Sequence, residues 1–173
     1  MTRKLPQRSA LLVLGTLIAL VNAAGSPVAA ATVQVPFKAH YSGTFVPTAT
    51  GFTVGGIGRA TQLGTSSNQG TVVMQSQPNP ACPTTGFVVT NDETLIAANG
   101  DQITLSILDM PCPVPGEPGI YDGVATYSIT GGSGRFTGAS GHGTFDGRGN
   151  FNDPSNLTFT YTFDGTISAP NAG

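Results

Sequence analysis

The sequence contains few charged residues, and this shortage excludes several classes of partner. Only 9% of the 173 residues are charged, with seven Lys and Arg against nine Asp and Glu. Three of the cations, Arg3, Lys4 and Arg8, lie together at the N-terminus, and the other four are scattered. Binding to a phosphate backbone or an anionic membrane surface requires clustered Lys and Arg. We therefore expect no nucleic-acid partner.

Long apolar runs are also missing, apart from one short stretch near the N-terminus. This stretch, residues 10–21, is shorter than the roughly 20 residues that a membrane span needs. It follows the basic N-terminal residues and precedes the small residues Ala29-Ala30-Ala31, a pattern typical of a secretory signal peptide. We predict a signal peptide over residues 1–31, cleaved near Ala31 or alternatively after Ala23, and a secreted or periplasmic product without membrane insertion.

Removal of the signal peptide leaves a weakly acidic domain. Four cationic residues then stand against nine acidic ones, a formal charge of −5. Residues 32–173 are sufficient for one domain with a real core. Aromatic and β-branched residues are frequent enough that we do not expect disorder.

Cysteine is scarce, with only Cys82 and Cys112. Two cysteines in an exported protein favour a disulfide. Both lie in proline-rich loops, at residues 79–83 and 110–115, on either side of an expected hairpin, so the bond would join its open end. In the chain-entropy model such a bond contributes about 3 kcal/mol. Two cysteines and two distant histidines are too few for a metal site, and we predict no metal and no cofactor.

Helical periodicity is absent outside the N-terminal stretch, whereas strand-like segments recur between turn signals. Asn99-Gly100 between two such segments predicts a hairpin with a type I′ turn. Glycines inside several segments are typical of strongly coiled barrel strands, and closure would remove unprotected sheet edges. We predict an all-β fold, an eight-stranded antiparallel β-barrel, with strands over residues 36–45, 52–63, 71–76, 86–97, 101–108, 120–129, 136–145 and 156–167.

The glycine-rich run of residues 127–143, YSITGGSGRFTGASGHG, is followed by FDGTI at residues 163–167. With GRATQLG at 58–64 and AANGDQI at 97–103, these segments resemble those of the allene oxide cyclase-like and dirigent-like barrels, most closely their uncharacterised exported bacterial members. The resemblance implies the barrel fold. It also implies relatives that cyclise an unsaturated epoxide or guide the coupling of phenolic radicals, often as trimers. It carries over no catalytic residue to this chain, because no stretch matches their polar pocket residues.

Inward-facing aromatic residues are the candidate ligand site. Tyr41, Tyr127, Tyr161, Phe159 and Phe163 alternate with polar residues and are expected inside the barrel, where they suit an apolar ligand with one polar end. The absence of tryptophan argues against lipocalins and biotin-binding barrels.

His142 is the remaining ligand-binding candidate. It points into the barrel if counted from Phe136 and outward if counted back from Phe145, so its orientation is open.

No catalytic motif stands out. The adjacent Asp92 and Glu93 must leave opposite faces of their strand and cannot form an acid–base pair. No nucleophile elbow, dinucleotide fingerprint or paired carboxylates are recognisable, so no catalytic residue is named.

Three functional hypotheses follow. The first is a non-catalytic binding or structural module for a small hydrophobic molecule. The second is a cyclase- or dirigent-like isomerase that acts by confining a reactive substrate. The third is a homo-oligomer that works through its outer barrel face. An interior cavity of roughly 300 Å³ or more would favour a ligand or substrate, whereas a packed interior would favour a structural role.

Overall fold

A computed structural model describes residues 33–82 and 86–168. The predicted signal peptide and its cleavage sites lie outside these residues. The described part consists of strands and a single 3-10 turn, in the order β1 (Gln34–Pro47), β2 (Gly51–Ala60), β3 (Gly64–Pro78), β4 (Phe87–Ala97), β5 (Gln102–Asp109), β6 (Cys112–Pro113), β7 (Ile120–Ser133), η1 (Gly134–Phe136), β8 (Ser140–Asn150) and β9 (Thr158–Ser168).

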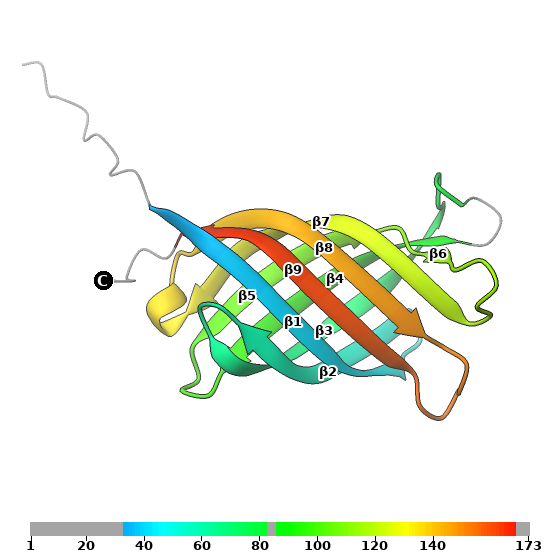
Figure 1. Ribbon diagram of the computed structural model, residues 1–173, viewed down its shortest axis with the longest axis horizontal. Coiled ribbons are helices and arrows are strands. Elements are labelled where there is room, and N and C mark those ends of the chain that lie inside the picture. The colour runs from blue at the N-terminus through cyan, green and yellow to red at the C-terminus, as the bar shows by residue number, and fades with distance from the viewer. Residues whose placement is uncertain (1–32, 83–85, 169–173) are drawn as a thin grey trace, which may run out of the picture. The chain divides into compact units, whose positions relative to one another are not determined.

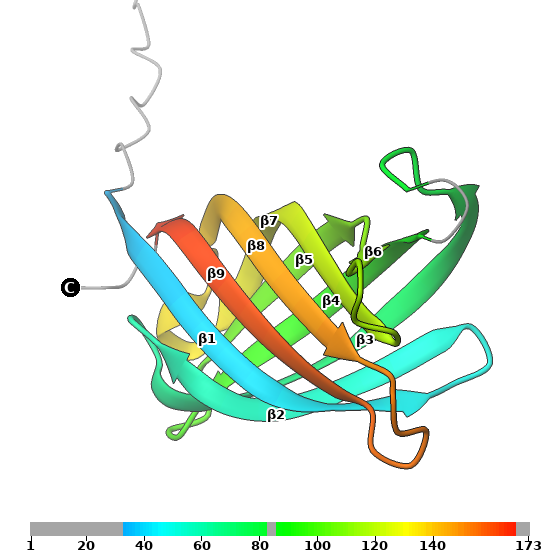
Figure 2. The same ribbon diagram turned by 45° about the vertical axis from the view of Figure 1, so that its right-hand side comes forward.

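Eight long antiparallel strands close into a barrel, which confirms the predicted fold class (Figures 1 and 2). The first and last strands, β1 and β9, pair from Gln34–Ser168 to Thr44–Thr158. Strands β5 and β7 pair as well and complete the ring, while the two-residue β6 only extends the edge of β7. Among the described residues, no helix has the length and apolar character needed to cross a membrane.

Alternation along each strand sends apolar side chains inward and polar side chains outward. On β1 the buried Phe37, Ala39 and Tyr41 alternate with exposed neighbours. Inward-facing glycines make room for the large rings: a Cβ on Gly58 would lie 2.6 Å from Cδ1 of Tyr41. Tyrosines can therefore fill the narrow interior of an eight-stranded barrel.

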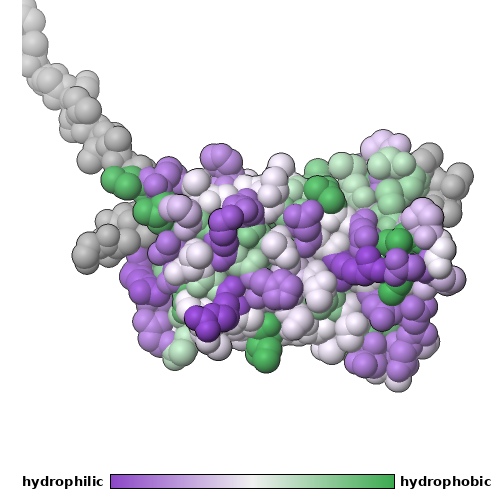
Figure 3. All heavy atoms as spheres, viewed as in Figure 1, coloured by the Kyte–Doolittle hydropathy of each residue, from purple (hydrophilic) through white to green (hydrophobic). Residues whose placement is uncertain are grey.

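The barrel exterior is mainly hydrophilic or neutral. Figure 3 shows isolated hydrophobic side chains among polar and neutral ones on one face. The most exposed large hydrophobic residues are Val33, Ile57 and Val124, and Ile57 and Val124 lie on different strands, β2 and β7. Single exposed apolar residues of this kind are ordinary on a protein surface.

The closed end of the barrel, as we call the end that holds η1, is covered by a short turn that the sequence did not predict. Phe136 was expected to begin a strand, but it lies in η1 and is buried in the core, and β8 starts only at Ser140. Arg135 holds η1 in place: its Nη2 donates to the Gln62 carbonyl at 2.6 Å and its Nε lies 3.2 Å from Asp101 Oδ2.

Two other predictions need correction. The Asn99-Gly100 hairpin exists, but only Gly100 has a positive φ, of 88°. The Gly100 amide donates to Ala97 and the Ala97 amide to Asp101, which is a three-residue loop with a glycine bulge rather than a type I′ turn. Strand β3 is also longer than predicted, Gly64–Pro78 instead of 71–76, because its polar inward residues Ser66 and Asn68 concealed its first half.

Candidate functional site: the barrel mouth

Polar side chains enter the barrel from β4 and β5. Asn91 and Glu93 share the inward face of β4, and Asp109 ends the inward face of β5. The register places Val89 opposite Asp109 and Asn91 opposite Ile107, so Asp109 and Asn91 come from adjacent strands at one end of the barrel.

Glu93 is a buried carboxylate held by two amides. Only 2% of it is exposed. Asn91 Nδ2 donates to one carboxylate oxygen at 2.7 Å and Asn68 Nδ2 to the other at 3.1 Å. Burial raises the pKa of Glu93 to about 7, although these two hydrogen bonds oppose the rise. Glu93 therefore titrates near neutral pH inside the barrel.

Asp109 is the second buried carboxylate. Its Oδ1 accepts a hydrogen bond from the Met110 amide at 2.8 Å. Burial raises the pKa of Asp109 to about 6, against the lowering effect of that hydrogen bond. Gly123 of β7 lies against the carboxylate, and a Cβ at this position would overlap both of its oxygens. Only glycine leaves space for Asp109 to face inward here.

Burial and the nearby carboxylates raise the pKa values of two interior tyrosines, Tyr41 and Tyr161. The Tyr41 hydroxyl lies 2.6 Å from Ser66 Oγ, and burial, with a smaller contribution from Glu93, raises its pKa to about 12. Burial first, and then the charges of Glu93 and Asp109, raise the pKa of Tyr161 well above its usual value. Both phenols therefore remain protonated under ordinary conditions.

Asp109 and Asn91 lie at a small cavity at the end of the barrel opposite η1, which we call the mouth pocket. Its volume is about 50 Å³. Seven aromatic residues dominate the lining, which comprises Phe45, Phe52, Phe87, Tyr121, Phe145, Phe151, Tyr161, Val72, Val89, Asn91, Asp109, Pro111, Gly147 and Gly149. The rings contact one another: Phe45 stacks on Phe151 at 5.2 Å between ring centroids, and Tyr121 meets Phe151 edge-on at 5.7 Å.

Within the described interior, three buried polar atoms have no hydrogen-bond partner: Asn91 Oδ1, Asn68 Oδ1 and the Tyr127 hydroxyl. Buried polar atoms without partners are rare because each costs free energy. Asn91 differs from the other two because it also lines the mouth pocket, where a bound molecule could reach it.

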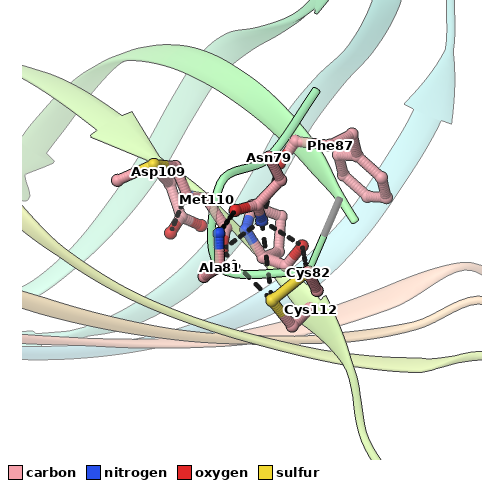
Figure 4. The surroundings of a disulfide bond; sticks show 8 residues. Asn79, Ala81, Cys82, Phe87, Asp109, Met110 and Cys112 are labelled. Atoms are coloured by element: carbon pink, nitrogen blue, oxygen red, sulfur yellow. Dashed lines mark hydrogen bonds between the residues drawn. A yellow bond between two sulfur atoms is a disulfide. The ribbon is translucent and has the colours of Figure 1, made fainter. Parts of the chain in front are cut away.

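The rim of the mouth pocket is held by a disulfide and a buried amide (Figure 4). Cys82 and Cys112 are bonded, with their Cα atoms 5.9 Å apart, as predicted. Beside them, the fully buried Asn79 donates through Nδ2 to the carbonyls of Met110 and Pro111, at 2.9 and 3.2 Å. The loop before β4 is thereby joined to the segment that follows Asp109.

The predicted aromatic residues all lie inside the barrel, as expected, but they do not form one site. Tyr161 lines the mouth pocket, whereas Tyr41, Tyr127 and Phe163 belong to the packed core. Tyr127 and Phe163 pack edge to face, with ring centroids 5.4 Å apart.

His142 does not take part in the interior. It is exposed on β8 and pairs with Ser128 and Thr166, so the count back from Phe145 gives its direction. The expectation that His142 lines an interior ligand site is therefore corrected.

The sequence reading missed Glu93, Asn91 and Asp109. Asp92 is exposed while Glu93 is buried, as the alternation required, yet the significance of the inward member was overlooked. A signal was present: the inward series Ile103, Leu105 and Ile107 continues to Asp109. Over residues 33–82 and 86–168, no three His, Cys, Asp or Glu side chains group as metal ligands.

Comparison with known proteins gave no match: no protein-family model, curated protein or solved structure matches this chain. The resemblance to allene oxide cyclase-like and dirigent-like barrels therefore stays a prediction.

Proposed function

We propose that this chain is an exported barrel protein that binds a small, mainly hydrophobic molecule at the mouth pocket. The observation that carries the proposal is an aromatic-lined cavity with polar groups, Asn91 and Asp109, in its lining. Small-molecule sites combine apolar walls with a few placed polar groups in this way. Export is supported by the N-terminal pattern and by the cysteine pair.

At about 50 Å³ the cavity is far below the roughly 300 Å³ that would favour an enclosed ligand or substrate, so the packed interior supports a structural role for the barrel and leaves room only for a small group at the mouth. An engineered cavity that binds benzene has a volume of about 150 Å³. The mouth pocket, at about 50 Å³, admits the head of a molecule whose remainder stays between the rim rings. A cyclase- or dirigent-like protein would need room for its whole substrate, so this alternative has less support.

The test follows neutral benzyl alcohol by NMR, with labelled protein and increasing ligand. We expect saturable shifts at the amides of Val89, Asn91 and Asp109, and none at the closed end. Val89→Phe fills the pocket and should weaken binding at least tenfold. Val124→Phe makes the same change at an exposed site and should leave binding unaltered.

Failure would be clear in either of two ways. Shifts confined to the outer strand faces, or no shifts at millimolar ligand, would contradict the proposal. If Val89→Phe does not fold, the site-resolved shifts of the unaltered protein still decide the question.

Oligomeric state is a separate part of this proposal. The third hypothesis, a homo-oligomer that uses its outer barrel face, predicts a mass above that of one chain in light scattering at high concentration. A strict monomer would remove that hypothesis and leave the binding proposal unaffected.

A further inference from the structure

Two buried acids, Asp109 in the lining of the mouth pocket and Glu93, which is hydrogen-bonded to Asn91, have no positive partner in the described protein. Its four Lys and Arg residues, Lys38, Arg59, Arg135 and Arg148, are all exposed. Three of them form ion pairs with other acids on the surface, Lys38 with Asp164, Arg135 with Asp101, and Arg148 with both Glu117 and Asp122. Both histidines are exposed as well. Asp109 and Glu93 are therefore buried acids without a protein counter-charge.

The polar groups of Asp109 and Asn91 at the pocket are suited to accept hydrogen bonds from a ligand. Asp109 presents a carboxylate, and within the described part of the chain only its Oδ1 accepts a protein hydrogen bond, from the Met110 amide. Asn91 uses its Nδ2 to bind Glu93, so the unpartnered Oδ1 is its remaining polar atom. Asp109 and Asn91 both line the cavity, and the buried Asn91 Oδ1 has unused bonding capacity among the described residues.

The aromatic lining of the mouth pocket also favours a positively charged ligand. The faces of aromatic rings carry negative potential and attract cations within about 6 Å. Five of the rings that line the pocket are Phe45, Phe145, Tyr161, Tyr121 and Phe151. Among residues 33–82 and 86–168, no Lys, Arg or His lines the pocket.

We propose that the molecule bound at the mouth pocket carries a compact organic cation, a primary ammonium group on an apolar tail. This inference rests on the proposed function and specifies its ligand class. The ammonium group donates to Asp109 and to Asn91 Oδ1, and the tail lies among the rim rings. The cavity of about 50 Å³ is of a size for such a head and too small for a large one.

The electrostatic balance of the interior supports this assignment. Burial has raised the pKa of Asp109 to about 6 and that of Glu93 to about 7, because water is excluded and no cation compensates. The titratable neighbours Tyr161 and Tyr121 supply no positive charge. A bound cation would compensate the buried charge, which a neutral head cannot do.

The test compares two probes that differ in charge and little else: benzylammonium and benzyl alcohol, titrated at pH 7.5 by NMR and calorimetry. Both heads donate hydrogen bonds and both tails are the same ring. We expect benzylammonium to bind at least tenfold more tightly. Asp109→Asn should abolish this preference, whereas Asp92→Asn, which removes the same charge from the outer face, should keep it.

The outcomes separate the two proposals. Equal affinity for the two probes, or a preference that survives Asp109→Asn, would overturn the cation assignment and leave the binding function intact. Failure of both probes to shift the pocket amides would overturn both. If Asp109→Asn is unstable, the unaltered protein decides the question: its preference for benzylammonium should weaken as the pH falls below about 6 and Asp109 takes up a proton, and a preference independent of pH would count against the assignment.

Discussion

The two ends of this barrel are built from different chemistry. At the closed end, Phe37, Ile129 and Ile167 fill the interior, and Phe136 packs into the same core. At the mouth, half-buried rings such as Phe151 surround a cavity with Asp109 in its lining. A buried acid without a counter-charge lowers stability, so the closed end must supply the stability that the mouth lacks.

The largest expected difference between the ends concerns their aromatic residues. Phe37 is fully buried and contacts Tyr127 edge to face, with ring centroids 6.1 Å apart. Phe37→Ala should lower the free energy of unfolding by roughly 3–5 kcal/mol, measured in urea. Phe151→Ala, at the mouth, should cost less than half as much. Equal losses would mean that the two ends contribute alike.

The disulfide gives the next largest effect, because it is the covalent link at the mouth. It closes a loop between residues 30 apart in sequence. Replacing both Cys82 and Cys112 with Ser should lower the unfolding free energy by about 3–4 kcal/mol in the chain-entropy model. Hydrogen exchange should rise mainly in β4 and β5 near Asn79. Faster exchange at the closed end instead would contradict a role confined to the mouth.

The buried acid Glu93 provides a smaller and pH-dependent test. Its pKa is raised from 4.5 to about 7, so between these values the folded state binds its proton more tightly than the unfolded state. The stabilisation that protonated Glu93 contributes to the folded state is fully present below pH 4.5 and is lost as the pH rises through 7. As the pH rises from 4 to 8, the free energy of unfolding of the wild type should fall by about 3 kcal/mol more than that of the Glu93→Gln variant.

Urea unfolding at several pH values measures this difference. Asp92→Asn is the matched control, because Asp92 is exposed on the same strand. A parallel pH dependence in wild type and Glu93→Gln would show that Glu93 is not the group responsible.

Much of the barrel could be predicted from alternation, and much of the site could not. Period-two patterns place Phe37 and Tyr41 inside because the sheet has one apolar face. Closure of the barrel was also predicted, from glycines inside the strands and from the need to remove unprotected sheet edges. The direction of the His142 side chain could not be predicted, because it depends on where β8 begins after η1. The apolar pattern of the sequence does not indicate the length of η1.

The mouth pocket was missed for a related reason. Glu93 and Asp109 are polar, and polar residues on a strand are usually expected to face water. Alternation along β4 and β5 places both side chains inward, but only the register of β4 against β5 brings Asp109 and Asn91 to the same end of the barrel. Which end of a barrel stays open depends on loops such as η1, whose packing is a tertiary property.

The positions of the tyrosines make the intrinsic fluorescence of the protein sensitive to the state of the barrel interior. The chain has no tryptophan and four tyrosines, three of them buried in the barrel and Tyr121 at the rim. Its near-ultraviolet emission therefore arises from tyrosines, three of the four inside the barrel. Ionised carboxylates quench such emission, so the light from Tyr161 should brighten when Glu93 and Asp109 take up protons. A fluorimeter and an acid titration would then read the charge state of the interior without a label.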